Sequence, residues 1–165
     1  VESISNVSSD DSNLERLNRW NCAISLFKER PLMGWGPGTY QFVYAPFQEA
    51  RYQTIISTNN ADGGNAHSEY LGPLAEQGIF GPVFVLLIFW YVCVLGFRLW
   101  NEINDIETRN LALGIYLGLM TYFIHGVLNN YLDTDKASAP FWGFIAFLVV
   151  LDIELREKTK KAITS

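Results

Sequence analysis

The feature that most constrains the fold of this chain is a pair of long segments without a single charged residue. Residues 79–97 and 110–132 contain no Asp, Glu, Lys or Arg, and most of their residues are apolar. Each is close to the ~20 residues that an α-helix needs to cross the hydrocarbon core of a bilayer. A soluble domain distributes its charges more evenly along the sequence. The pattern therefore predicts a membrane protein.

A third, shorter apolar segment follows these two. It begins near residue 138 and reaches a full span only if it extends to Leu155. Helices satisfy their own backbone hydrogen bonds inside a bilayer, so the pattern predicts an all-α fold. We therefore expect the membrane region 79–155 to contain three transmembrane helices, at about 79–99, 111–131 and 138–155.

The cations around these segments predict which side of the membrane each part faces. Six of them lie on one side, namely Arg98, Arg109 and the four of the tail 156–165, whereas the opposite short turn holds only Lys136. Cytoplasmic segments of membrane proteins carry an excess of Lys and Arg. The basic tail is therefore predicted to be cytoplasmic. Residues 1–78 are then an extracytoplasmic, partly helical loop region with amphipathic helices.

The polar first half is not preceded by an exporting segment. It begins with Val1 and a stretch rich in Ser, Asn and Asp, which does not have the pattern of a signal peptide. A polar region outside the membrane needs a spanning segment before it. We therefore expect the chain to be the C-terminal part of a longer multi-pass protein.

Charge and cysteine content argue against several classes of function. The net charge is −5, and no basic patch with interleaved aromatic residues is present, so we expect no nucleic-acid partner. Cys22 and Cys93 have no ligand spacing. Asp133 and Asp135 alone are an incomplete metal site. The sequence therefore predicts neither a metal nor a cofactor. The partner that it predicts is the lipid bilayer.

The polar half opens with a predicted amphipathic helix. Residues 12–15, Ser-Asn-Leu-Glu, are typical of a capping box, and apolar residues follow at helical spacing until Pro31 stops the helix. Arg16 and Arg19 lie one turn apart on it. They are either solvated surface arginines or arginines directed at phosphates from a helix on the membrane surface, a task that suits the planar guanidinium.

A histidine stands in the polar segment directly before the first apolar one. Asn65 is predicted to cap a short helix that carries His67 and is closed by Gly78. An imidazole at the membrane boundary exchanges protons near neutral pH beside a lipid-anchored substrate. The alternative is an ordinary surface histidine. Arg51 is the only cation between residue 31 and the first apolar segment.

Several motifs, taken in order over roughly residues 12–152, resemble one known family. Arg16 lies four residues before Trp20, and the glycine-rich segment Pro31–Tyr40 comes next. Its turn, residues 34–38, lacks the ending of a phosphate-binding loop and is interpreted as structural. After a variable loop come Ala66–Leu71 and Glu76–Gly81. This order resembles the O-antigen ligase and O-antigen polymerase family, in its large periplasmic loop and the spans that follow.

The resemblance implies a metal-independent membrane glycosyltransferase of the bacterial cytoplasmic (inner) membrane. It would move a glycan from undecaprenyl diphosphate to an acceptor hydroxyl on lipid A core, a growing polysaccharide or a protein. By analogy with the family, His67 would deprotonate or orient the acceptor hydroxyl, and Arg16 would neutralise the departing diphosphate. Arg19 and Arg51 are secondary candidates for binding the same anion. The isolated 165 residues are expected to be inactive if preceding spans form half of the donor groove.

The chain departs from the family at one position, and two other classes of function are alternatives. The family usually has Asn directly after its histidine, where this chain has Ser68, a residue that also forms hydrogen bonds. A transporter component is one alternative, but the apolar segments lack the buried charges and broken helices of ion paths. The other is a non-catalytic membrane scaffold or sensor, in which Arg16 and His67 would be replaceable.

Overall fold

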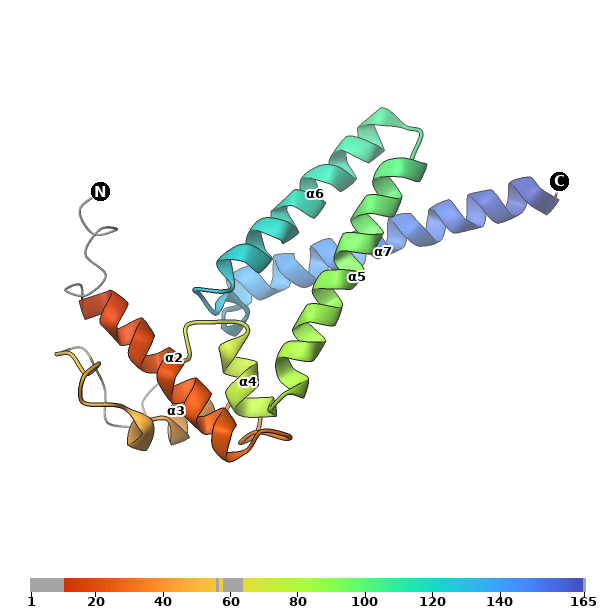
Figure 1. Ribbon diagram of the computed structural model, residues 1–165. Helices are drawn as coiled ribbons and strands as arrows, with labels where there is room; N and C mark the ends of the chain where they lie inside the picture. Colours follow the sequence, from red (N-terminus) through yellow and green to blue (C-terminus); the bar gives the residue numbers. More distant parts are fainter. Residues whose placement is uncertain (1–10, 56, 58–63, 165) are drawn as a thin grey trace. The chain divides into compact units, whose positions relative to one another are not determined.

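The computed structural model describes residues 11–55, 57 and 64–164, and every regular element within them is a helix. This confirms the predicted all-α class (Figure 1). The chain divides into two compact units. The first comprises Val1–Val85 with Gly126–Asn130, and the second comprises Leu86–His125 with Tyr131–Ser165.

The first unit is built around a long helix that packs against a short one. The long helix, α2, begins at Asp11 and ends at Glu29, next to the predicted stop at Pro31. The short helix α4 (Leu71–Gln77) packs against it. The helical turns α3 (Tyr40–Val43) and η1 (Ala45–Phe47) lie between them in the sequence. Apolar residues of these elements and of the segments between them form one core. Its buried members are Cys22, Ala23, Leu26, Tyr40, Tyr44, Ala66 and Ala75.

The buried face of α2 is polar in its first half and apolar in its second. Its buried residues recur at three- and four-residue spacing and are Glu15, Asn18, Arg19, Cys22, Ala23 and Leu26. The apolar positions Leu14 and Leu17 are only half-buried, and Ile24 is exposed. Polar side chains are buried in helices where they bond one another. Hydrophobicity alone therefore could not predict which face of α2 is buried.

The glycine-rich turn after α2 is structural, as its sequence indicates, and it is attached to the end of α4. The N–H groups of Trp35 and Gly36 donate to the carbonyl oxygens of Ala75 and Glu76, at 3.2 and 2.7 Å. The Glu76 carboxylate in turn accepts the N–H groups of Gly38 at 2.8 Å and Tyr40 at 3.0 Å. The glycine-rich segment Pro31–Tyr40 and the motif that begins at Glu76 are therefore hydrogen-bonded to each other.

Helix α4 ends as predicted but begins later. Gly78 follows its last residue with φ 65°, a left-handed conformation that favours glycine. His67, expected on this helix, instead lies in the loop before it, four residues ahead of Leu71. The reason is that the side chains of Asn65 and Ser68 bond the backbone of residues 67–71 and hold it in turns.

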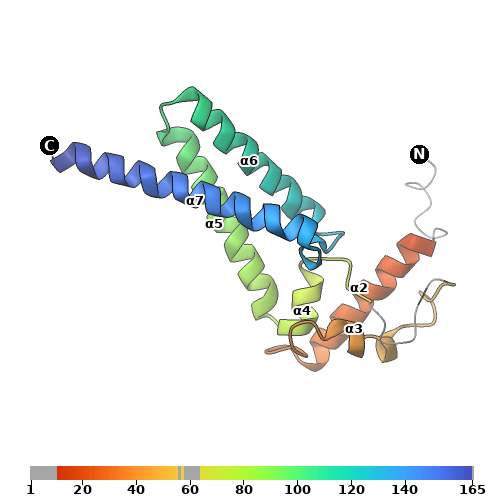
Figure 2. The same ribbon diagram turned by 180° about the vertical axis from the view of Figure 1, so that it is seen from behind.

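The second unit consists of the main part of one long helix and two others that follow it. The elements are α5 (Phe80–Glu102), whose first residues belong to the first unit, α6 (Ile106–His125), η2 (Tyr131–Asp133) and α7 (Asp135–Thr164). Figure 2 shows α5 and α6 joined by a short connection. At Gly96, an added Cβ would lie 2.2 Å from the Tyr116 ring, so the absence of a side chain allows close packing between α5 and α6. Aromatic rings of Tyr122, Phe123 and Phe141 join α6 to α7.

Within the part of the chain that the structure describes, two helices are long and apolar enough to cross a membrane, namely α5 and the stretch Asp135–Ala162 of α7. The predicted second span, 111–131, corresponds to α6, but this helix ends at His125. Directly after it the chain turns, and the carbonyl oxygens of Gly126 and Asn129 accept the N–H of Glu69, at 2.8 and 3.2 Å. That tertiary contact coincides with the end of the helix, which stops before the apolar segment does.

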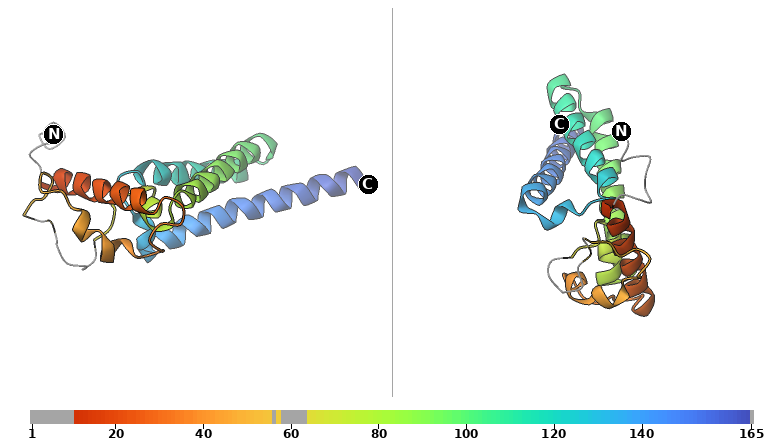
Figure 3. Two further views of the ribbon diagram at one scale, coloured as in Figure 1. Left: turned by 60° about the horizontal axis from the view of Figure 1, so that its bottom comes forward. Right: turned by 90° about the vertical axis from the view of Figure 1, so that its left-hand side faces the viewer.

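The longest helix, α7, continues beyond the predicted third span of 138–155 and through the basic tail as far as Thr164 (Figure 3). Asp152 lies on it, and its side chain is only 6% exposed. It pairs with Arg98 of α5 at 3.0 Å and with Arg156 at 2.7 Å. Arg98, which follows the first apolar segment, therefore lies near Arg156, which begins the basic tail.

Candidate active site

His67 lies in a left-handed backbone conformation in the loop between Gly64 and α4. Its φ is 47°, which makes it the one residue other than glycine with positive φ among the described residues. Its N–H donates to the Asn65 side-chain oxygen at 3.0 Å, and its carbonyl oxygen accepts the indole N–H of Trp20 at 3.5 Å. A residue held in such a conformation is fixed by its surroundings. The loop therefore places the imidazole beside α2.

The residues directly after His67 fix the loop from the other side. Ser68 is buried, and its hydroxyl oxygen accepts the N–H groups of Tyr70 and Leu71, each at 3.3 Å. Glu69 is bonded through its N–H to the turn after α6. The serine that replaces the family's asparagine therefore has a defined role, since it holds the backbone between His67 and α4.

The electrostatic surroundings of His67 favour a neutral imidazole. Burial lowers its pKa most, and the positive charges of Arg19 and Arg16 lower it further, against a smaller opposing effect of Glu15. A lowered pKa leaves the imidazole unprotonated at neutral pH, with a lone pair able to accept a proton. His67, Arg16 and Arg19 thus form one electrostatic group.

Arg19 is buried and engaged inside the first unit. Its Nε donates to the Glu15 carboxylate at 2.5 Å, and its guanidinium carbon lies 4.1 Å from the centre of the Tyr44 ring. An added Cβ on Gly64 would lie 1.8 Å from Arg19 Nη1, so this glycine lets the loop pass directly over the guanidinium. The Tyr40 hydroxyl donates to the Arg19 carbonyl oxygen at 2.7 Å. Arg19 therefore holds the fold around the site.

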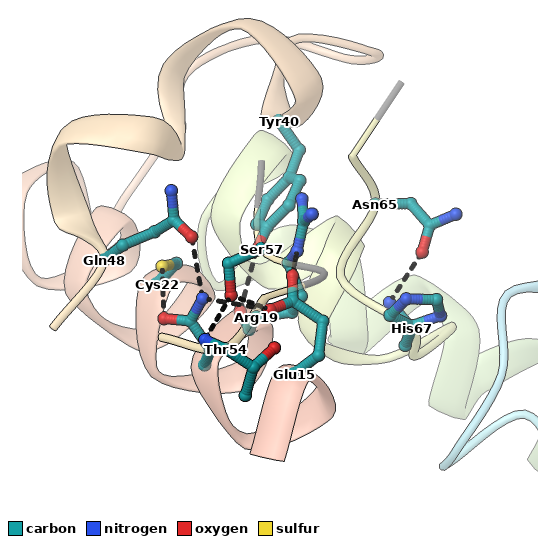
Figure 4. Close-up of polar contacts among 10 residues, drawn as sticks. Glu15, Arg19, Cys22, Tyr40, Gln48, Thr54, Ser57, Asn65 and His67 are labelled. Atoms are coloured by element: carbon teal, nitrogen blue, oxygen red, sulfur yellow. Dashed lines mark hydrogen bonds and ion pairs between the residues drawn. The ribbon is translucent and has the colours of Figure 1, made fainter. Parts of the chain in front are cut away.

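Glu15 and Asn18 extend this arrangement into a polar network (Figure 4). The Glu15 carboxylate accepts the Ser57 hydroxyl and, at 3.4 Å, the Asn18 amide. Asn18 also donates to the Gln48 side-chain oxygen at 2.7 Å. In Figure 4 the His67 ring lies beside this network rather than within it. The predicted capping box of residues 12–15 is wrong, because α2 begins at Asp11 and Ser12 lies inside it. Glu15 pairs with Arg19 instead, and their spacing of four residues is a signal for such an ion pair.

Arg16 differs from Arg19 in having its charge available. It is half-buried, and among the described residues its side chain has no hydrogen bond or ion pair. It nevertheless lies near enough to His67 to lower the pKa of that imidazole. A guanidinium that has no partner among the described residues and acts through its charge on a neutral imidazole is suited to bind an anion.

Arg51 is not brought to this group. Its side chain is 67% exposed, and its Nε pairs with the Glu49 carboxylate at 2.5 Å. Its guanidinium carbon also lies 4.7 Å from the centre of the Tyr52 ring. The hydrogen bond from Asn21, followed by that from Arg51, lowers the pKa of Glu49. Arg51 thus belongs to a separate surface pair.

Other kinds of chemistry find little support at this site. Burial raises the pKa of the Cys22 thiol to about 11, so it is not a nucleophile at neutral pH. Within residues 11–55, 57 and 64–164, no group of three or more His, Cys, Asp or Glu is placed to hold a metal ion. The site offers an imidazole base and a guanidinium.

These features define an all-helical membrane protein that presents a histidine and an arginine from one compact unit. A family model described as O-antigen ligase matches residues 1–87, just over half of the 165-residue chain. The chain belongs to the O-antigen ligase family. Membership implies glycosyl transfer of the ligase or polymerase kind, in a membrane.

Similarity to other known proteins is limited. A stretch of 53 residues is 43% identical to ATP synthase subunit b, chloroplastic, of Anthoceros angustus. It covers 32% of this chain, which spans only 28% of the length of that protein. No solved structure matches the chain. The family assignment therefore rests on the O-antigen ligase match and the motifs that lie within it.

Proposed function

We propose that this chain carries the extracytoplasmic catalytic group of a membrane glycosyltransferase that uses undecaprenyl diphosphate-linked glycans. One observation carries the proposal. A half-buried histidine with a lowered pKa is electrostatically coupled to Arg16, whose side chain has no hydrogen-bonding partner among the described residues. An acid–base group and an anion-binding group are what transfer from a diphosphate to a hydroxyl requires.

His67 is the proposed base. As the acceptor oxygen bonds to the anomeric carbon of the donor sugar, its proton passes to the unprotonated nitrogen of the imidazole. The lowered pKa keeps that nitrogen available at neutral pH. The left-handed conformation of His67 and the bonds from its backbone to Asn65 and Trp20 fix the position of its backbone. General-base catalysis needs a base held in place in this way.

Arg16 is the proposed electrostatic partner of the leaving group. When the bond from the anomeric carbon to the diphosphate breaks, its electron pair stays on the diphosphate oxygen, and the guanidinium neutralises the added charge. Arg19 is already paired with Glu15, so we assign it to holding the site. Arg51 remains a secondary candidate that would need to leave its pairing with Glu49 to bind the anion. No metal takes part in this scheme.

The membrane topology belongs to the same proposal. Residues 1–78 lie outside, three membrane helices follow, and the C-terminus is cytoplasmic. The ion pairs that join Arg98, Asp152 and Arg156 support one common side for the first connection and the basic tail. The extracytoplasmic side has no ATP or nucleotide sugar, so the donor arrives already activated on its lipid. The acceptor is a hydroxyl of lipid A core, a growing polysaccharide or a protein.

The test uses the full-length protein in cells that lack it. His67→Ala and Arg16→Ala are introduced separately, and Lys28→Ala, an exposed cation on the same helix, is the matched control. Membrane levels are measured by blotting and surface glycans by gel electrophoresis. We expect glycan transfer to disappear in the first two variants and to persist in the control. Normal glycans in both site variants, at normal protein levels, would refute the catalytic assignment and favour a scaffold.

A further inference from the structure

The turn after α2 presents two large apolar side chains to the outside. Leu32 is 66% exposed and Met33 is 75% exposed. The turn that carries them is well defined, because the Gly34 N–H donates to the Arg30 carbonyl oxygen at 3.0 Å and Gly34 has φ 64°. Adjacent exposed apolar side chains on a fixed turn indicate a surface that meets an apolar partner.

This turn is attached to the start of α5. The Ile79 N–H donates to the Pro31 carbonyl oxygen at 2.9 Å. An added Cβ on Gly78 would lie 2.3 Å from the Leu32 carbonyl oxygen, so the two backbones are in direct contact. Ile79, directly before α5, and Phe80, the first residue of α5, are themselves 43% and 44% exposed. We call the exposed side chains of Leu32, Met33, Ile79 and Phe80 the apolar anchor.

We propose that the apolar anchor inserts into the outer leaflet of the membrane and fixes the height of α2 above it. The partner follows from continuity with α5. That helix is long and apolar enough to span a bilayer, so its first residues lie at the boundary between water and lipid. A turn hydrogen-bonded to those residues lies at the same level, and its apolar side chains enter the lipid.

The residues around the turn fit the interface between lipid headgroups and acyl chains. The Arg30 guanidinium carbon lies 4.0 Å from the centre of the Trp35 ring. Tryptophan and cationic side chains are enriched at this level of membrane proteins. The Trp35 indole N–H donates to the Leu26 carbonyl oxygen at 3.1 Å, which ties the turn back to α2. The anchor and the helix thus move as one piece.

The consequence for the site follows from the length of α2. Arg16 lies 13 residues before the helix end at Glu29, which is roughly 20 Å along the axis of an α-helix. An anchor at that end holds the arginine and the attached His67 loop at a set distance from the lipid surface. This part of the inference rests on the proposed function, because a donor held by a lipid presents its diphosphate at a fixed depth.

The test measures the depth of Met33 in the full-length protein, reconstituted in vesicles of phosphatidylethanolamine and phosphatidylglycerol. After replacement of the native cysteines, Met33→Cys carries a nitroxide spin label. Ser12→Cys, exposed at the other end of α2, is the matched control. We expect the label at position 33 to be more accessible to oxygen than to a water-soluble nickel chelate, and the label at position 12 to show the reverse.

Two results would overturn the anchor. If the nickel chelate reaches position 33 as readily as position 12, the turn lies in water. If neither oxygen nor the chelate reaches position 33, another protein segment covers it instead of lipid. The readout does not depend on glycan transfer, so the anchor can fail while the catalytic assignment of His67 stands, and the reverse also holds.

Discussion

Replacing Gly34 by alanine tests the contact that joins the glycine-rich turn to α4. An added Cβ there would lie 2.4 Å from the Glu76 carbonyl carbon, and the backbone has φ 64°. The left-handed conformation costs about 1–2 kcal/mol for a residue with a Cβ. The clash with backbone atoms adds overpacking of about 1–3 kcal/mol. Gly34→Ala is therefore expected to lower the free energy of unfolding by roughly 2–5 kcal/mol.

Gly38→Ala is the matched control for this prediction. Gly38 has φ 73°, in the same left-handed region, but an added Cβ would meet nothing within 4 Å. Only the conformational cost of about 1–2 kcal/mol applies. The measurement is equilibrium unfolding of the purified full-length protein in detergent, followed by tryptophan fluorescence. Equal losses in the two variants would refute the close approach of the turn to α4.

Further predictions concern protonation and the ion pairs of the second unit. Because the folded state lowers the pKa of His67, the unfolded state binds more protons below about pH 6.5, so stability falls as pH drops through that value. His67→Asn, which tolerates a left-handed backbone, should remove this contribution in unfolding measured against pH. In the active protein, the acid limb of kcat/KM should lie below pH 6.5, and a limb above it would contradict the lowered pKa. Asp152→Asn leaves Arg98 without its buried partner and should cost about 1–3 kcal/mol of stability, whereas Glu102→Gln, on an exposed partner of the same arginine, should cost no more than about 0.5 kcal/mol. Equal effects of these two substitutions on thermal unfolding would argue against the buried pair.

The end of α2 and the end of α4 could be predicted because local chemistry sets them. Pro31 stops one helix and Gly78 closes the other, and neither needs tertiary structure to act. The end of α6 is different. Its apolar segment continues past His125, but the carbonyl oxygens that follow bond to Glu69, more than fifty residues earlier. A contact between such distant residues leaves no mark in local spacing.

The sequence proposes the candidate site residues, but it could not predict which of the two arginines on α2 is buried. Arg16 and Arg19 lie one turn apart, and the sequence alone leaves either of them as the candidate for binding an anion. The buried face of α2 decides between them, since it turns Arg19 toward Glu15 and Tyr44, whereas Arg16 acts on His67 through its charge. The placement of His67 off the helix had a local cause, because the side chains of Asn65 and Ser68 compete for the backbone.

The most direct test of the account is the rate of glycan transfer by the purified full-length protein, with a polyprenyl diphosphate-linked donor and excess acceptor. Wild type is compared with His67→Asn, after both are shown to unfold at similar denaturant concentrations at pH 8. Loss of a general base predicts a rate lower by about 10²–10⁴-fold. A rate within a few-fold of wild type would contradict the assignment of His67 as the catalytic base.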